Sequence, residues 1–189
     1  LIEWLTDWVR DYGIDGFRVD TAKHVQTYIW ADLKNAAQNA LQDWRAANPT
    51  KPGADWSEDF WTTAEVFGHG LNKSNYHTTG QFDSVINFGF KNDVNNMINN
   101  PSAMVNTWNN YANAVNTDSS WNGLSYISSH DTGSVFYNGD NNRQKEAGTA
   151  LILLPGGVQI FYGDEMGRSN GPGGSDPDQG SRSSIDWNK

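Results

Sequence analysis

Segments with strand-like spacing alternate with segments with helix-like spacing along nearly all of the 189 residues. Apolar side chains recur every second residue in the former and every third or fourth residue in the latter, which are the periods of a strand and of a helix. Strands that alternate with helices are typical of βαβ units. The sequence therefore predicts an α/β fold in which five strands form a parallel sheet.

The pattern also predicts where each element lies. Strands are expected at 14–20, 60–67, 82–88, 124–129 and 158–162, and helices at 2–12, 27–47, 93–111 and 143–154. Gly, Pro, Asp and Ser favour loops, and they are frequent in 49–59 and 167–189. We expect the second of these segments to be a long surface loop.

Composition excludes several classes of protein. The chain has no Cys, 9 Trp, and a formal net charge of −9 from 13 basic and 22 acidic side chains. A hydrophobic content of 37% can form a sizeable core, which argues against disorder. We expect no nucleic acid partner, because binding phosphates needs clustered Lys and Arg. Neutral, polyhydroxylated ligands fit this composition better, and disulfides and thiolate metal sites are excluded.

No membrane partner is expected either. The longest apolar stretch, 147–162, contains Pro155-Gly156-Gly157 and is shorter than the roughly 20 residues of a spanning helix. The first residues have neither an initiator Met nor the layout of a signal peptide, so we interpret the start as internal. The absence of Cys leaves the compartment open, since extracytoplasmic proteins need not contain disulfides.

Three carboxylates, those of Asp20, Glu65 and Asp131, each come at the C-terminal end of a predicted strand. β/α folds place their active sites at these ends. If the sheet closes into a barrel, the strand ends converge. A site with several carboxylates and few lysines then favours cleavage of a glycosidic bond.

Retaining cleavage needs one ionised carboxylate and one protonated acid. Arg18 is two residues before Asp20, hence on the same strand face, where its positive charge is expected to keep Asp20 ionised. Glu65, facing two other carboxylates, is expected to keep its proton more readily. Two such environments separate the titrations of nucleophile and acid.

Four segments resemble, in order, motifs of the α-amylase family of glycoside hydrolases. GFRVDTAKH at 16–24 is similar to the family's strand-four motif, and AEVF at 64–67 to its strand-five acid motif. SSHD at 128–131 is similar to the strand-seven motif, and 156–165 to the strand-eight segment. Each match alone is weak, but four in register make a specific signal.

The resemblance implies a parallel (β/α)8 TIM-type barrel, of which residues 1–189 supply roughly the C-terminal five β/α units as a partial catalytic domain. It places the N-terminal strands, the inserted domain and the C-terminal β domain of the family outside this sequence. A complete barrel needs about 250 residues. We therefore expect the isolated chain to have open barrel edges, weak stability, a tendency to self-associate, and little activity.

The resemblance also implies roles for individual residues. Asp20 is the expected nucleophile, Glu65 the expected general acid/base, and Asp131 is expected to bind sugar hydroxyls and stabilise the transition state. Arg18 and His130 are expected to orient the nucleophile and to contact the sugar before the scissile bond.

Lys23 and His24 match positions that bind substrate beyond the scissile bond. The backbone carbonyl of His24 is implied as a calcium ligand, with most other ligands outside this chain; the alternative is a helix-start histidine without a ligand role. Calcium is thus the one implied cofactor. His69 and His77 are interpreted as solvated side chains, because no spacing supports a metal cluster.

Six aromatic residues could stack on sugar rings, although most are expected in the core: Trp30, Phe67, Phe88, Phe90, Tyr162 and Trp187. In the C-terminal segment, Asp176 and Asp178 could bind a cation, and a plain loop is the alternative. Arg182 is expected to touch distal sugars.

The implied substrates are α-1,4-glucans such as starch, glycogen and maltodextrins, hydrolysed with retention of configuration. An extracellular or periplasmic location is favoured by the same resemblance. Two alternatives stay open: a transglycosidase or isomerase of the family, and a catalytically silent carbohydrate-binding or interaction domain. A non-sugar enzyme on a doubly wound sheet is a weaker alternative, because no Gly-rich phosphate loop follows a predicted strand.

Overall fold

The computed structural model describes residues 1–188 and confirms the α/β architecture, with five short strands whose described pairings are parallel. The chain divides into two compact units. The first consists of 1–67, 73–86 and 120–122, and the second of the rest of the described chain.

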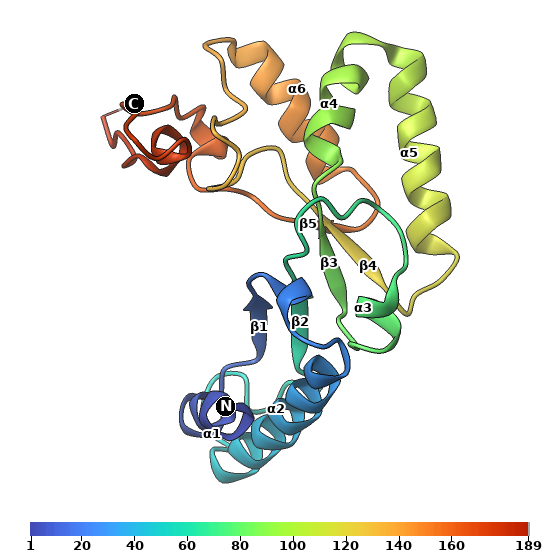
Figure 1. Cartoon of the computed structure of the whole chain (residues 1–189), viewed down its shortest axis with the longest axis vertical. Helices are drawn as coiled ribbons and strands as arrows, with labels where there is room; N and C mark the ends of the chain where they lie inside the picture. The colour runs from blue at the N-terminus through green and yellow to red at the C-terminus, as the bar shows by residue number, and fades with distance from the viewer. Residues whose placement is uncertain (189) are drawn as a thin grey trace. The chain divides into compact units, whose positions relative to one another are not determined.

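In the first unit, two helices pack together beside the first strands (Figure 1). They are α1 (Ile2–Tyr12) and α2 (Tyr28–Ala47), and the strands are β1 (Gly16–Val19) and β2 (Trp61–Ala64). β2 also pairs in parallel with β3 (Ser84–Asn87). The buried residues between these helices and strands are Val9, Ala37, Ala40, Leu41 and Phe60.

Two short elements complete this unit. The 3-10 helix η1 (Ala22–His24) follows β1, and α3 (Asn75–Thr78) precedes β3. The sequence pattern did not predict α3. His77 forms its cap, because Nδ1 of His77 accepts a hydrogen bond from the N–H of Ser74 at 3.1 Å. The interpretation of His77 as a solvated side chain is therefore wrong: it is buried and belongs to a helix cap.

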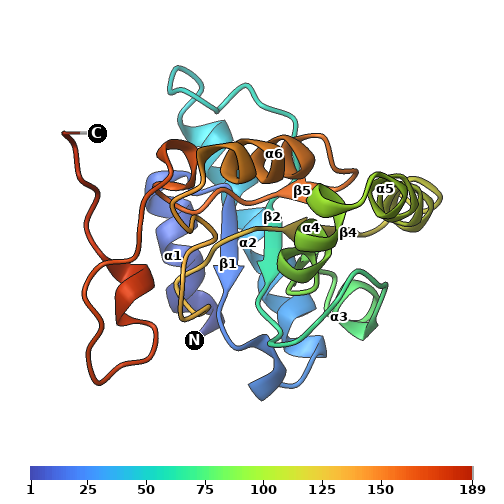
Figure 2. The ribbon, with the colours of Figure 1, turned by 90° about the horizontal axis from the view of Figure 1, so that it is seen from above.

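The second unit contains three helices, with α4 (Phe90–Asn99) between α5 (Pro101–Asn116) and α6 (Asn141–Ile152) in both views (Figures 1 and 2). β4 (Asn122–Ser125) pairs in parallel with β5 (Gly157–Val158). The core of this unit consists of Phe90, Val94, Met97, Tyr111, Ile127, Phe136, Ala147, Ala150, Leu151 and Leu154.

The single helix predicted over 93–111 is wrong, because the chain breaks at Asn100 and Pro101. Asn100 has extended backbone angles, and its side chain accepts hydrogen bonds from the N–H groups of Ser102 and Ala103 at 3.0 and 3.3 Å. An Asn cap followed by Pro at the first helical position starts a new helix. α4 and α5 are therefore separate elements.

All five strands are shorter than predicted, and the last two are also displaced. The strand expected at 158–162 is limited to the two residues of β5. The strand expected at 124–129 begins and ends earlier, as β4. Asp131 consequently lies in the loop after β4 and not at the end of a strand.

The C-terminal segment is more ordered than a plain surface loop. It contains the 3-10 helix η3 (Gln179–Arg182), and the 3-10 helix η2 (Asp164–Met166) directly precedes it. Arg168 and Ser181 are buried within it. In residues 1–188, no helix has the length and apolarity needed to cross a bilayer.

Gly13 fixes the junction between α1 and β1. It has a left-handed φ of 68°, and its N–H donates to the carbonyl of Val9 at 2.8 Å. A Cβ atom at this position would overlap the indole ring of Trp44 on α2. Only Gly allows both the left-handed turn and this close approach.

We expect Gly13→Ala to lower the free energy of unfolding by about 2 kcal/mol or more, because left-handed strain of roughly 1–2 kcal/mol adds to the overlap with Trp44. Urea denaturation measures the loss. Gly53→Ala is the matched control, since Gly53 also has a left-handed φ, 82°, but its Cβ would make only an ordinary 3.7 Å contact with Trp56. Equal losses in the two variants would contradict the role of Trp44.

Candidate active site

Arg18, Asp20 and Glu65 lie together at the C-terminal ends of β1 and β2. The parallel register pairs Val19 with Ala64, and the next residues along the two strands are Asp20 and Glu65. The N–H of Glu65 donates to the carbonyl of Val19 at 2.8 Å. Strand pairing therefore brings the two carboxylates to the same level of the sheet.

The expected pairing of Arg18 with Asp20 is confirmed. Nη1 of Arg18 lies 2.6 Å from Oδ1 of Asp20, and the side chain of Asp20 is 65% exposed. An exposed ion pair contributes little to stability. Its consequence here is orientation: one oxygen of Asp20 is held while the side chain stays accessible to a ligand.

Glu65 is buried and is held by the residue that follows Asp20. Its Oε2 accepts a hydrogen bond from the N–H of Thr21 at 2.7 Å, and its backbone carbonyl accepts one from Ala22 at 2.9 Å. Thr21 has a left-handed φ of 46°, which is uncommon for a β-branched residue. This strained turn aims the Thr21 amide at Glu65 and so couples the positions of Glu65 and Asp20.

Lys23 and His24 lie on η1 and are exposed. Nζ of Lys23 is 5.6 Å from the ring centroid of Phe67, a cation–π distance. Phe67 is 65% exposed. Trp30, in contrast, uses its indole N–H to bond the carbonyl of Ala22 at 3.1 Å, which indicates a structural role.

His130 and Asp131 lie together in the second unit, in the loop between β4 and α6. Nε2 of His130 is 3.0 Å from Oδ2 of Asp131, and Nη2 of Arg182 is 2.8 Å from Oδ1. Arg182 also donates to the carbonyl of His130 at 2.9 Å and to Asp176 at 2.7 Å. Both oxygens of Asp131 thus have a partner, and Asp176 pairs with Arg182.

Two further cations fix the remainder of this loop. Lys91, in α4, donates to the carbonyls of Thr132 and Ser134 at 3.3 and 3.2 Å. Burial lowers the pKa of Lys91 below its ordinary value. Arg143, in α6, donates to the carbonyl of Phe136 at 2.6 Å and lies 3.8 Å from its ring centroid. Both helices therefore hold the loop that carries Asp131.

A chain of hydrogen bonds links this loop to η2. The N–H of Phe136 donates to Oγ of Ser128 at 2.8 Å, and the Ser128 hydroxyl donates to Oδ1 of Asp164 at 2.6 Å. Oδ2 of Asp164 is buried and has no hydrogen-bond partner. Burial raises the pKa of Asp164 to about 6.

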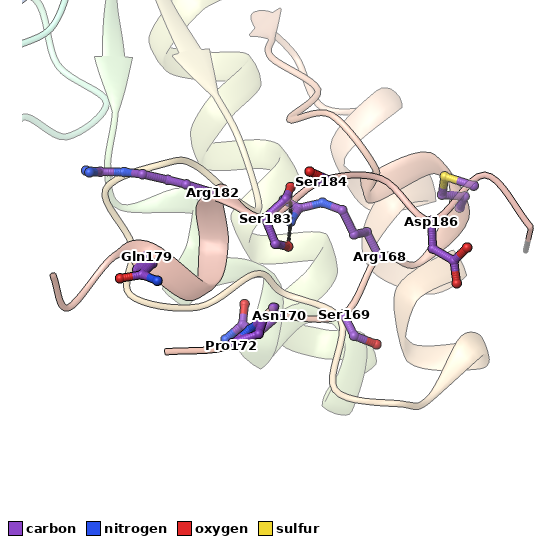
Figure 3. A pocket seen from close by; sticks show the side chains of 11 residues that line it. Arg168, Ser169, Asn170, Pro172, Gln179, Arg182, Ser183, Ser184 and Asp186 are labelled. Atoms are coloured by element: carbon purple, nitrogen blue, oxygen red, sulfur yellow. Dashed lines mark hydrogen bonds between the residues drawn. The ribbon is translucent and has the colours of Figure 1, made fainter. Parts of the chain in front are cut away.

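The C-terminal segment forms a polar pocket of about 590 Å³ (Figure 3). Arg168 organises it by donating to the hydroxyl of Ser183 at 2.7 Å and to the carbonyl of Ser181 at 2.8 Å. Its guanidinium also lies 4.3 Å from the ring centroid of Tyr162. Figure 3 shows the Arg168 guanidinium directed at Ser183, and Arg182 extending away from it.

The carboxylate and His side chains of the described residues do not gather into a metal site. Calcium takes six to eight oxygen ligands, and no group of three or more His, Asp or Glu side chains in residues 1–188 could hold a metal ion. The carbonyl of His24 alone does not make such a site. Calcium binding through His24 therefore stays a prediction.

Burial lowers the pKa of His69, whose Nδ1 is 2.7 Å from the carbonyl of Gly70.

The structure thus assembles two groups of the predicted residues, each within one unit. Arg18, Asp20 and Glu65 form one group, and His130 and Asp131 form the other. That these two groups meet around one substrate stays a prediction. The sequence pattern missed the contributions of Thr21, Lys91, Ser128 and Asp164, because each acts through a contact between segments that are distant in the sequence.

The raised pKa of Asp164 predicts a pH-dependent cost in stability. Because this pKa is above the ordinary 3.8, the folded protein binds the proton more tightly than the unfolded one. Proton binding by Asp164 therefore stabilises the folded protein. This stabilisation is complete below pH 3.8 and is lost as the pH rises through about 6. The change in the free energy of unfolding that Asp164→Asn causes, relative to wild type, should therefore be about 2 kcal/mol more stabilising at pH 8 than at pH 4.

Urea denaturation at the two pH values measures this difference. The control is Glu146→Gln on α6, whose carboxylate is exposed and whose replacement should have the same effect at both pH values. If Asp164→Asn showed no pH-dependent gain, the carboxylate would not carry the buried charge.

Comparisons with known proteins extend these observations. A family model described as "Alpha amylase, catalytic domain" matches residues 1–187. The periplasmic alpha-amylase of Escherichia coli K12 is 47% identical over 187 residues, which are 99% of this chain and 26% of that protein. The maltogenic alpha-amylase of Bacillus acidopullulyticus is 28% identical over 191 residues, covering 96% of this chain and 28% of that protein. The chain thus spans about a quarter of the length of these relatives.

Solved structures show the same fold. The alpha-amylase of Geobacillus thermoleovorans, complexed with acarbose, has a TM-score of 0.72 and 23% identity, over 99% of this chain and 39% of that chain. The cyclic alpha-maltosyl-(1→6)-maltose hydrolase of Arthrobacter globiformis, in complex with maltose, has a TM-score of 0.64 and 20% identity, over 99% of this chain and 38% of that chain. The fold is therefore part of a TIM-type barrel.

Proposed function

The chain belongs to the α-amylase family of glycoside hydrolases, and on that premise we propose that its protein hydrolyses α-1,4-glucosidic bonds of starch, glycogen or maltodextrins with retention. One observation carries this proposal. An accessible, Arg-paired carboxylate, Asp20, stands beside a buried carboxylate, Glu65, at adjacent strand ends. Retaining hydrolysis uses two carboxyl groups in these two roles.

The reaction proceeds in two displacements. Glu65 donates its proton to the glycosidic oxygen while an oxygen of Asp20 attacks the anomeric carbon, so the leaving sugar departs with that proton. A covalent glycosyl ester on Asp20 results. Glu65 then takes a proton from water, whose oxygen attacks the anomeric carbon and releases Asp20 as a carboxylate.

The surroundings of each residue support its role. Arg18 binds one oxygen of Asp20 at 2.6 Å, and the Asp20 side chain stays accessible to a sugar. Glu65 is buried, and the amide of Thr21 holds its Oε2 at 2.7 Å, so the position of this carboxyl group is fixed at the strand end next to Asp20. Asp131, with both oxygens bonded by His130 and Arg182, presents a fixed negative charge. Such a charge stabilises an oxocarbenium-like transition state.

Substrate contacts follow from the exposed groups around η1. Phe67 offers an aromatic face, while Lys23 and His24 offer donors beside it. We assign these three residues to the sugar beyond the scissile bond and His130 to the sugar before it. The acarbose and maltose bound to the two solved relatives support a glucan ligand.

The five strands are proposed to be the fourth to the eighth of the barrel, which agrees with the order of the four motifs. We further propose that residues 1–189 alone are weakly stable and self-associate through open strand edges, since unpaired edges template further pairing. Light scattering of the isolated chain tests this. A stable, fully active monomer of this length would refute it.

The catalytic assignment predicts the kinetics of three variants of the full natural polypeptide. Glu65→Gln should lower kcat by about 10²- to 10⁴-fold, the usual contribution of a general acid/base. Asp131→Asn should lower kcat by about 10²- to 10³-fold, as expected for a lost electrostatic contact. Asp20→Asn should abolish turnover, because no glycosyl ester can form. Reducing-sugar release from soluble starch measures all three.

Two controls accompany these variants. Asp7→Asn changes a carboxylate on α1 that pairs only with Arg10 among the described residues, and it should retain wild-type kcat. Circular dichroism checks that each variant folds. The anomeric proton signals of fresh products should show the α configuration; full starch hydrolysis by Asp20→Asn, or β products, would reject the mechanism.

Transglycosylation is a second candidate, favoured by the relatives. The cyclomaltodextrin glucanotransferase of Bacillus sp. strain 1-1 is 25% identical over 94% of this chain and 23% of that protein. Both reactions pass through the same glycosyl enzyme and differ in whether water or a sugar hydroxyl accepts the glycosyl group. Products longer than maltoheptaose, formed from maltoheptaose, would indicate transfer.

A further inference from the structure

The hydroxyl of Ser128 joins the two ends of the loop that carries His130 and Asp131. Ser128 is fully buried, and its Oγ accepts a hydrogen bond from the N–H of Phe136 at 2.8 Å. A hydroxyl has one hydrogen to donate and two lone pairs. Because the amide of Phe136 can only donate, the hydroxyl hydrogen of Ser128 needs a different acceptor.

Asp164 supplies that acceptor from the start of η2. Its Oδ1 is 2.6 Å from Oγ of Ser128, a distance typical of a hydrogen bond to an ionised oxygen. The ionised carboxylate therefore fixes one direction for the whole chain of bonds, from the Phe136 amide through Ser128 to Asp164. A protonated Asp164 could donate to Ser128 instead, and the direction would no longer be fixed.

The carboxylate of Asp164 is held where its charge is costly. Oδ2 is buried without a hydrogen-bond partner, and burial opposes ionisation, as does the neighbouring charge of Glu165. The positive charges of Arg168 and Lys91 favour the ionised form. A charge retained at a cost in stability is typical of a residue that serves function.

The backbone around Asp164 is fixed independently of its carboxylate. Gln144, in α6, donates to the backbone carbonyl of Asp164 at 2.8 Å. The N–H of Asp164 donates to the carbonyl of Phe161 at 3.0 Å. Replacing the carboxylate therefore leaves these two backbone bonds in place, while it changes the bond to Ser128 and removes the charge that faces Arg168 and Lys91.

We propose that Asp164 is a positioning residue for Asp131, acting through the hydroxyl of Ser128. The link closes the base of the loop, while Lys91 and Arg182 hold its two sides. The inference rests on the proposed function in one respect, namely that Asp131 stabilises the transition state. Nothing in it requires Asp164 to touch the substrate.

A double-mutant cycle in the full natural polypeptide tests the link. Asp164→Asn and Ser128→Ala are each expected to lower kcat on maltoheptaose by about tenfold to a hundredfold, the effect of a small misplacement of a reacting group. The double variant should be no slower than Ser128→Ala, because Asp164 acts through that hydroxyl. Glu146→Gln, which removes an exposed carboxylate from α6, is the control and should keep wild-type kcat.

Two further measurements accompany the cycle. Hydrogen exchange of the Phe136 amide reports the bond itself, and it should accelerate in both single variants, whatever the substrate. The pH profile of kcat separates positioning from a structural role: in wild type the rate should fall as the pH falls through about 6, and Asp164→Asn should lack that component. A residue with only a structural role could change stability and exchange, but it would leave this pH profile unchanged.

The outcomes are distinct. Unchanged kcat in Asp164→Asn, or losses that add in the double variant, would overturn the proposed link between Asp164 and Asp131. Normal turnover in Asp131→Asn would overturn the proposed function, whereas the exchange rate of the Phe136 amide would still report the bond between Asp164 and Ser128.

Discussion

The parallel pairing of β1 with β2 is the constraint on which the group of Arg18, Asp20 and Glu65 depends. The register places Val19 opposite Ala64, so the residues that leave the two strands are Asp20 and Glu65. Main-chain hydrogen bonds fix this arrangement before any side chain contributes. The bond from the Thr21 amide to Glu65 then restricts the second carboxylate relative to the first. A site built on paired strands is more rigid than one built on loops alone.

The loop that carries Asp131, in the second unit, is held differently. β4 ends at Ser125, so Asp131 lies on a loop whose conformation depends on side-chain bonds. Lys91, Arg143 and Arg182 each reach a backbone carbonyl of that loop. A loop carries polar backbone groups that need partners when they are removed from water. Here cations from two helices and from the C-terminal segment supply those partners.

Two local features are unfavourable by themselves, and each occurs beside one of the two groups of predicted site residues. Thr21 has a left-handed backbone although it is β-branched, and Asp164 keeps a carboxylate in a buried position. Each feature is retained by surrounding hydrogen bonds. The amide of Thr21 is directed at Glu65, and Asp164 binds the hydroxyl of Ser128 at the base of the loop that carries Asp131. Such local conflicts are expected where a structure serves chemistry and not stability.

The sequence by itself determined the α/β class, most of the elements, the shared face of Arg18 and Asp20, and the four motifs of the family. These are properties of local spacing, which the periods of strand and helix encode. It did not predict the break at Pro101 or the cap formed by His77, although Asn100-Pro101 was a readable signal for a new helix. Only the tertiary structure decided that Thr21 binds Glu65, that Arg182 binds Asp131 and that Ser128 binds Asp164. The physical reason is that each bond joins segments tens of residues apart, and the pattern along one segment carries no record of which distant group will meet it.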